Sequence, residues 1–113
     1  MHYLRIMSEL EPAIQRVFDA TNRADSEAFV DAFAEDGVID DWGRTFTGHD
    51  EIASWNAREN IGVHSHIEPG EVTRDGDAYK VGVTVSGDGY NGGGAFTFTL
   101  APDGRIVRMT ITG

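Results

Sequence analysis

Cysteine is absent from this 113-residue sequence, and long apolar runs are absent as well. Without cysteine there is no disulfide, no thiolate nucleophile and no zinc site built on sulfur. No apolar stretch approaches the about 20 residues that a membrane-spanning helix needs. The first residues also lack the apolar run and the cleavage site of a signal peptide. We therefore expect a cytoplasmic protein.

Basic residues are scarce. Nine Lys and Arg residues stand against 19 Asp and Glu residues, which gives a formal net charge of −10 at pH 7. Binding to nucleic acid or to an anionic membrane requires clustered basic residues, so we expect neither partner. The content of 40% apolar and 10% aromatic residues is typical of a folded protein. The length predicts a single domain that spans residues 1–113.

Residues 8–22 have the pattern of a helix. Ser8 and Glu11 match a capping box, in which each side chain binds a backbone N–H group at the start of the helix. Pro12 falls in the first turn, where the missing N–H group of proline does little harm. Apolar residues then recur at helical spacing, so we expect one face of this helix in the core.

Two shorter helices are expected further along the chain. Asp25 is a typical capping residue, and the helix that follows it would bury Phe29 and Phe33 and end at Gly37. A third helix is expected over residues 50–60, because an aspartate begins this segment and its apolar residues share one face.

The remaining segments have the composition and alternation of strands. Residues 38–42 and 44–47 predict two short strands. Longer strands, separated by turns that contain glycine, are expected over residues 63–73, 78–86, 95–101 and 105–112. Helices that cover one side of an antiparallel sheet make an α+β architecture, which is the fold class that we expect.

One set of residues follows an order and spacing known from a protein family: Gln15, Arg16, Asn22, Asp25, Phe29, residues 33–37, Asp40, Asp41, Gly48, Ile52 and residues 104–106. In these residues the chain resembles the nuclear transport factor 2-like superfamily, in its SnoaL-like and ketosteroid-isomerase-like branch. The resemblance implies a cone-shaped α+β barrel, in which a curved antiparallel sheet wraps around a long N-terminal helix with two shorter helices. It also implies an apolar pocket inside the cone and a homodimer.

The resemblance leaves the reaction open, because this superfamily contains isomerases, cyclases, dehydratases and non-catalytic binding modules. It places Asp41 at the position of the proton-transferring carboxylate of ketosteroid isomerase. It also places Val17 and Phe96 where that enzyme has two donors for the enolate oxygen, and neither side chain is a donor. We therefore do not expect true steroid isomerase activity.

Two functions remain open from the sequence. In the first, the pocket binds a small apolar, carbonyl-bearing metabolite and catalyses proton transfer without a cofactor, with Asp41 as the base. His64 or His66 would be the acid or an orienting donor, because residues two apart on a strand share a face. In the second, the domain binds a ligand or dimerises without catalysis. Asp41 would then pair with Arg44 or Arg58, and the histidines would lie on the surface.

Aromatic and polar side chains are expected to line the pocket, although the same rings are needed in the core. The expected ligand-binding residues are Phe18, Phe33, Trp42, Trp55, Asn56, Glu59, Tyr79, Phe96, Phe98 and Met109. The homodimer would form through a threonine-rich outer face of the sheet, made of Thr84, Thr97, Thr99 and Thr110.

Two further motifs have simpler interpretations. The glycine-rich residues 87–94 have no Lys or Ser/Thr at the spacing of a phosphate-binding loop, and we expect them to form a loop over the pocket. His64 and His66 could form a metal pair with Asp41, but no third histidine is placed to complete such a site. No metal is therefore expected.

Overall fold

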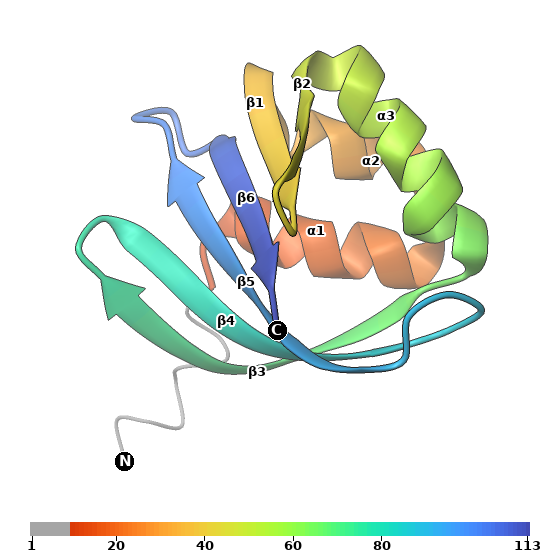
Figure 1. Cartoon of the computed structure of the whole chain (residues 1–113). Helices are drawn as coiled ribbons and strands as arrows, with labels where there is room; N and C mark the ends of the chain where they lie inside the picture. The colour runs from red at the N-terminus through yellow and green to blue at the C-terminus, as the bar shows by residue number, and fades with distance from the viewer. Residues whose placement is uncertain (1–9) are drawn as a thin grey trace.

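The computed structural model describes residues 10–113, so the part of the expected capping box at Ser8 lies outside the described residues. Within this range six strands form one sheet in the order β2-β1-β6-β5-β4-β3 (Figure 1). The helices are α1 (Pro12–Arg23), α2 (Ser26–Asp31), α3 (Gly48–Glu59) and the 3₁₀ turn η3 (Ile61–Val63). The strands are β1 (Phe33–Asp41), β2 (Arg44–Thr47), β3 (His66–Asp75), β4 (Ala78–Ser86), β5 (Gly92–Leu100) and β6 (Ile106–Thr112).

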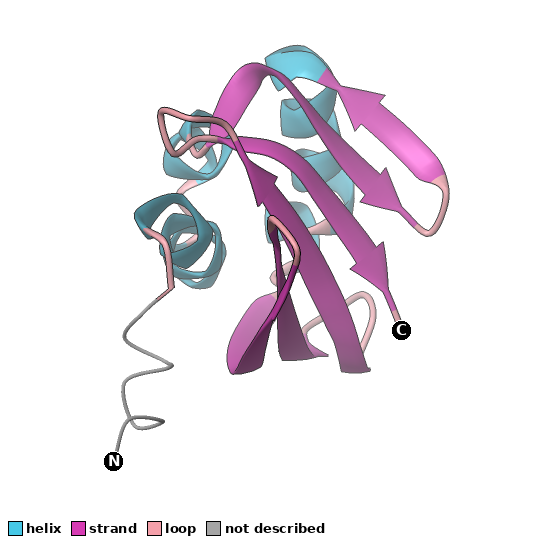
Figure 2. Ribbon diagram, turned by 90° about the vertical axis from the view of Figure 1, so that its left-hand side faces the viewer, coloured by secondary structure: helices cyan, strands magenta, loops and turns pink. Residues whose placement is uncertain are grey.

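The sheet curves around α1, and Figure 2 shows the helices gathered on one side of it. The expected α+β cone is thus confirmed. One strand pair departs from the expected antiparallel order, because β6 lies between β5 and β1 and runs parallel to β1. Helices α1 and α3 have 12 residues each, so α2 alone is short. Among residues 10–113, no helix is long and apolar enough to cross a membrane.

Hydrogen bonds at both ends of α1 join this helix to the sheet. The helix begins at Pro12, and Glu11 makes no side-chain capping bond, so the capping role expected for Glu11 is wrong. The Glu11 carboxylate instead accepts a hydrogen bond from the Tyr79 hydroxyl at 3.0 Å. At the other end, the Asn22 side chain binds both the N–H and the carbonyl group of Ile67. Helix α1 is therefore held against β4 at its start and against β3 at its end.

The second helix is shorter than the sequence predicts. Asp25 caps α2 as expected, but the helix ends at Asp31, and both Phe33 and Gly37 belong to β1. The rings of Phe29 and Phe33 still meet in the core, 5.5 Å apart, although they come from a helix and a strand. Gly37 marks an irregularity in the register of β1 against β6, where an added Cβ atom would lie 3.0 Å from two backbone oxygens.

Other boundaries differ by a few residues. Helix α3 begins at Gly48 rather than at Asp50. Strand β4 has the predicted bounds, whereas β5 begins at Gly92, so the glycine-rich segment is part loop and part strand. The pairing of β5 with β6 has an irregularity between Thr99 and Leu100, and Leu100 pairs there with Ile106, which is fully buried in the core.

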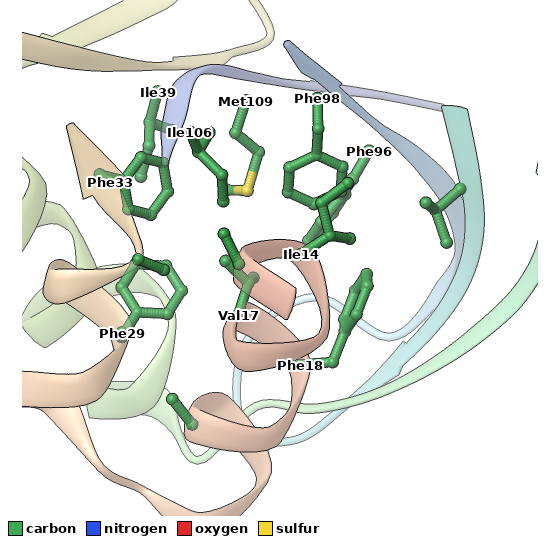
Figure 3. Packing of buried hydrophobic residues seen from close by; sticks show 14 of the residues in the cluster. Ile14, Val17, Phe18, Phe29, Phe33, Ile39, Phe96, Phe98, Ile106 and Met109 are labelled. Carbon is green, nitrogen blue, oxygen red and sulfur yellow. The ribbon is translucent and has the colours of Figure 1, made fainter. Parts of the chain in front are cut away.

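The core lies between α1 and the inner face of the sheet (Figure 3). Phe18 packs against Phe96 and Phe98, with both ring centroids 6.0 Å from its own. Full burial of one such ring stabilises the fold by about 1.5–3 kcal/mol. The largest fully buried apolar side chains are Phe18, Phe29, Phe33, Phe98, Ile14, Ile39, Ile52, Ile106, Met109, Val17 and Val81.

Candidate functional site

A cavity of about 380 Å³ lies at the end of the cone where α3, η3 and the β4–β5 loop approach the ends of β1 and β6. Its wall is largely apolar, and its volume is within the range that holds small molecules. The apolar lining side chains are Trp42, Trp55, Val63, Ile67, Val83, Val85, Tyr90, Phe96 and Ile111. The polar ones are Asp41, Arg58, Glu59, Asn60, Ser65 and Thr112.

The cavity adjoins a part of β5 where large side chains are missing. Phe96 lies on the inner face of β5, and Gly94 occupies the preceding position on the same face. Gly94 pairs with Val83 of β4 and lines the cavity. A Cβ atom at Gly94 would lie 2.9 Å from the backbone oxygen of Thr112, so this point of the strand requires glycine. Gly94 therefore leaves this part of the cavity wall without a side chain.

Asp41 is the last residue of β1 and lies in the cavity wall. Its side chain is 12% exposed. Trp55 Nε1 donates a hydrogen bond to Asp41 Oδ2 at 3.1 Å, and the guanidinium group of Arg44 donates to the same oxygen. Both bonds use Oδ2, and among residues 10–113 Asp41 Oδ1 makes no hydrogen bond. One oxygen is therefore used for positioning, and the second is left for a bound molecule.

Arg44 joins Asp41 to a second carboxylate of the wall. Its two terminal nitrogens donate to Glu59 at 2.7 and 3.0 Å, the two-point geometry of strong arginine–carboxylate pairs. The hydrogen bond from Arg44 lowers the pKa of Glu59 below its usual 4.5, and the same bond is the main reason why the pKa of Arg44 is raised. The pairing of Asp41 with Arg44 and its place in the cavity, expected as alternatives, thus occur together.

Two buried asparagines, Asn56 in α3 and Asn60 directly after this helix, are hydrogen-bonded to each other. The side-chain amide of Asn60 donates to Thr21 Oγ1 at 3.0 Å and to Asn56 Oδ1 at 2.9 Å. Asn60 lines the cavity, whereas Asn56 is fully buried behind it. The structure therefore places Asn60, which the sequence analysis missed, where Asn56 was expected.

His64 and His66 lie on the outer surface, with side chains 79% and 52% exposed, and neither lines the cavity. His64 Nδ1 is 2.8 Å from the Asp88 carboxylate, and His66 Nε2 is 3.1 Å from that of Glu68. The expected strand through both histidines is wrong, because His64 follows η3 with a left-handed backbone, φ 57°. Gly62 permits this turn, since a Cβ atom there would overlap the backbone of α3.

The structure divides the expected ligand-binding residues into two groups. The side chains that line the cavity are Trp42, Trp55, Glu59 and Phe96. The side chains that lie elsewhere are Phe18, Phe33, Asn56, Tyr79, Phe98 and Met109. Tyr79 is at the edge of the core, where burial, together with the hydrogen bond to Glu11, raises its pKa. No group of three metal-ligating side chains occurs in the part of the chain that the structure describes.

Solved structures share this architecture. A candidate polyketide cyclase from Sinorhizobium meliloti is 33% identical, with a TM-score of 0.83 over 93% of this chain and 97% of that chain. A Mycobacterium tuberculosis protein solved with estradiol-17β-hemisuccinate is 17% identical, with a TM-score of 0.77 over 88% of each chain. The epoxide hydrolase/cyclase-like enzyme SalBIII, of pyran ring formation in salinomycin, is 24% identical, with a TM-score of 0.75 over 88% and 86%.

A search of the curated proteins gives no match. The sequence model of the SnoaL-like domain, in contrast, matches residues 14–109, from the first turns of α1 to the middle of β6. This range includes the helices, the sheet and most of the cavity wall. The expected resemblance is confirmed, and the chain belongs to the SnoaL-like domain family of the nuclear transport factor 2-like fold.

Proposed function

We propose that the cavity binds a small apolar metabolite with a carbonyl group, and that Asp41 is the base of a proton transfer that needs no cofactor. The observation that carries this proposal is the Asp41 carboxylate, held by Trp55 and Arg44 through Oδ2, in a largely apolar wall. Oδ1 is then the atom that accepts a proton from the carbon beside the carbonyl. Isomerisation of an unsaturated ketone, aldol-type cyclisation and elimination of water beside a ketone each include such a step.

The proton that leaves the ligand also returns to it, so the reaction needs no second substrate. The C–H bond electrons form a carbon–carbon double bond while the carbonyl becomes an enolate, and Asp41 Oδ1 holds the proton until it returns to another atom. The enolate oxygen needs a hydrogen-bond donor. His64 and His66 lie outside the cavity, so we assign this role to the hydroxyl-bearing residues of the wall, Ser65 and Thr112.

The neighbours support the class of ligand. The Sinorhizobium protein and SalBIII carry names that refer to cyclisation, and the Mycobacterium protein was solved with a steroid derivative. A steroid is apolar and rigid, and the wall of the present cavity, formed by side chains such as Ile67, Val83 and Ile111, has the same apolar character. An apolar ligand with few polar groups fits this wall.

Hydrogen–deuterium exchange at the carbon beside a ketone tests the proposal without knowledge of the natural substrate. Native protein should accelerate exchange in D₂O for at least one member of a panel of apolar ketones, observed by NMR. Asp41→Asn should slow this exchange about 100-fold or more. Asp40→Asn is the matched control, because Asp40 binds Gly43 and Arg108 outside the cavity. Equal exchange by native protein and Asp41→Asn would remove Asp41 from the role.

A binding module without catalysis is the second candidate function. Its support is the pair of positions where the resemblance implies enolate donors: Val17 is buried in the core, and Phe96 contributes only a ring to the wall. In this case calorimetry would detect binding of an apolar ketone, while the native protein would leave exchange at the background rate.

We also propose that the chain forms a homodimer through the outer face of the sheet. Thr97 and Thr110 are directly paired on neighbouring strands of this face, and Thr84 and Thr99 extend it. Threonine is common on half-buried sheet surfaces. Light scattering at micromolar concentration should give twice the 12.3 kDa chain mass, and a monomer mass would contradict the dimer.

A further inference from the structure

Trp42 and Tyr90 are the exposed large apolar residues in the described part of the chain. Trp42 is 68% exposed and Tyr90 is 62% exposed. Both line the same cavity. Trp42 comes from the turn between β1 and β2, and Tyr90 comes from the loop between β4 and β5. Contiguous exposed apolar surface usually marks a place where something binds. Two exposed rings at one opening, from segments far apart in sequence, have this character.

The backbone at Trp42 shows that the turn itself does not favour this residue. Asp41 pairs with Arg44, so Trp42 and Gly43 form a two-residue hairpin turn. Their φ angles are +54° and +92°, as in a type I′ turn, where both are positive. Asn-Gly is the preferred pair for this turn, and a bulky residue with positive φ is an outlier. The preference of the turn therefore does not explain why residue 42 is a tryptophan.

Contacts around Trp42 hold the ring beside the cavity. The backbone N–H of Trp42 donates to the carbonyl of Ile111 at 3.3 Å, which joins the turn to β6. The ring lies against the end of the chain, since a Cβ atom at Gly113 would be 2.7 Å from it. Ile111 also lines the cavity. Trp42 is therefore fixed next to the wall while most of its ring surface stays in water.

The loop that carries Tyr90 is also held in place. The Tyr90 hydroxyl donates to the carbonyl of Gly93 at 2.7 Å. The side chain of Asn91 binds both the N–H and the carbonyl group of Gly87, and the N–H of Asp88 donates to Val63 at 2.9 Å. Both exposed rings thus have defined positions before a ligand arrives, which reduces the entropy lost on binding.

We propose that Trp42 and Tyr90 bind a part of the ligand that extends out of the cavity. This inference rests on the proposed function, in which the carbonyl end of the ligand lies near Asp41. The ligand is then elongated, with its head inside the cavity and a flat apolar arm against the two rings. It carries no negative charge, because the wall holds two carboxylates, Asp41 and Glu59, against one guanidinium group, Arg58, in a chain with a net charge of −10.

Two ketones that share a naphthyl ketone group, one with and one without an aromatic arm, distinguish binding at Trp42 and Tyr90 from binding inside the cavity. The short probe is 2-acetylnaphthalene, and the long probe is its benzylidene derivative, 1-(2-naphthyl)-3-phenylprop-2-en-1-one. In calorimetry, Trp42→Asn should weaken the long probe about tenfold more than it weakens the short probe, because the long probe alone loses the aromatic contact of its arm. Trp42→Asn should unfold at the same or a higher temperature, since asparagine fits the turn. Trp42→Phe, which keeps a ring, should retain most of the affinity.

Each outcome has a defined meaning. Equal weakening of both probes, or no weakening of the long one, overturns this inference alone. If native protein binds neither ketone, the proposed function fails and this inference fails with it. Tyr90→Leu provides a second test and should also weaken the long probe selectively; no selective loss would contradict the role of Tyr90. If Trp42→Asn lowers the mass in light scattering, the ring belongs to a contact between copies and the inference is overturned.

Discussion

Strand β5 has two halves with different roles, and their contrast explains where this cone is closed and where it is open. In one half, Phe96 and Phe98 project into the core and pack on Phe18. In the other half, residues 92–94 are glycines, and Gly93 and Gly94 line the cavity. The comparison teaches that glycines within a strand, rather than a special binding motif, leave the space of this cavity.

Polar side chains follow the same division. At the open end, Asp41, Arg44 and Glu59 form a charged cluster at the cavity wall. At the closed end, the hydroxyl of Tyr79 binds the carboxylate of Glu11 at the edge of the core. Charged groups thus lie at the cavity or at the edge of the core, where a ligand or water can reach them, and the interior of the packed half has apolar contacts.

The largest effect is expected from the closed half. Phe98→Ala removes a ring that is fully buried and contacts the rings of Phe18 and Phe96. The free energy of unfolding should fall by about 3–5 kcal/mol, measured by urea denaturation. Phe96→Ala is the matched variant, and it should cost less because Phe96 borders the cavity and is already open on one side. Equal losses would contradict the division of β5.

A second pair of variants tests the same difference on β4, the strand that pairs with β5. Val81 pairs with Phe96 and is fully buried, whereas Val83 pairs with Gly94 and lines the cavity. Val81→Phe should overpack the core and lower the free energy of unfolding by about 1–3 kcal/mol. Val83→Phe should lower it less, because the larger ring enters open space, and should abolish binding of 2-acetylnaphthalene in calorimetry. The opposite order of stabilities would show that the packed half lies elsewhere.

The sequence was sufficient for the fold class and for part of the wall. Val83 and Ile111 lie in the strands that were expected over residues 78–86 and 105–112, and both line the cavity. Alternation does not reveal how far packing extends along the cone, so neither residue could be assigned to the cavity rather than to the core. The glycines of residues 92–94 were the available signal, but they indicated a loop because glycine is rare inside strands.

The errors have local physical causes. Phe29 and Phe33 are four residues apart, a spacing that fits one helix as well as a helix followed by a strand. His64 was expected on a strand because the strand was predicted over residues 63–73, and the left-handed turn at His64 depends on tertiary contacts. Asn60 looked like an ordinary helix end, and its hydrogen bond to Thr21 joins residues 39 positions apart. Such long-range contacts are not encoded in a local pattern.

The closed end should respond to alkaline pH. Burial is the main cause that raises the pKa of Tyr79 above its usual 10.0, and the hydrogen bond to Glu11 adds to it. Folding therefore favours the neutral phenol, and this stabilisation is complete below pH 10.0 and lost as the pH rises through the folded-state pKa. Tyr79→Phe should cost about 1 kcal/mol at neutral pH, from the lost hydrogen bond.

Thermal unfolding measured over a pH series tests this expectation. The native protein should lose stability above pH 10.0 more steeply than Tyr79→Phe, which has no hydroxyl group to titrate at this position. Tyr90→Phe is the control, because Tyr90 is 62% exposed. An alkaline decline that is unchanged in Tyr79→Phe would show that another group is responsible.

The open end should respond to acid, with the smallest effect. The pKa of Glu59 is lowered by the hydrogen bond from Arg44, so the folded state favours the carboxylate. This stabilisation is present above pH 4.5 and is lost as the pH falls through the folded-state pKa. Glu59→Gln should remove about 0.2–1 kcal/mol, since the pair is partly exposed, and should flatten the acid side of the profile.

The control for acid is Glu71→Gln, a change of equal charge at an exposed position of β3. The acid and alkaline sides of the pH profile together then test whether the open end and the closed end are independent. Glu59→Gln should alter the acid side and leave the alkaline side, and Tyr79→Phe should do the reverse. If either variant changed both sides, the two ends would be coupled through the core. The cavity could then not be altered by ligand or mutation without changing the packed half, and the independence on which the proposed site depends would be lost.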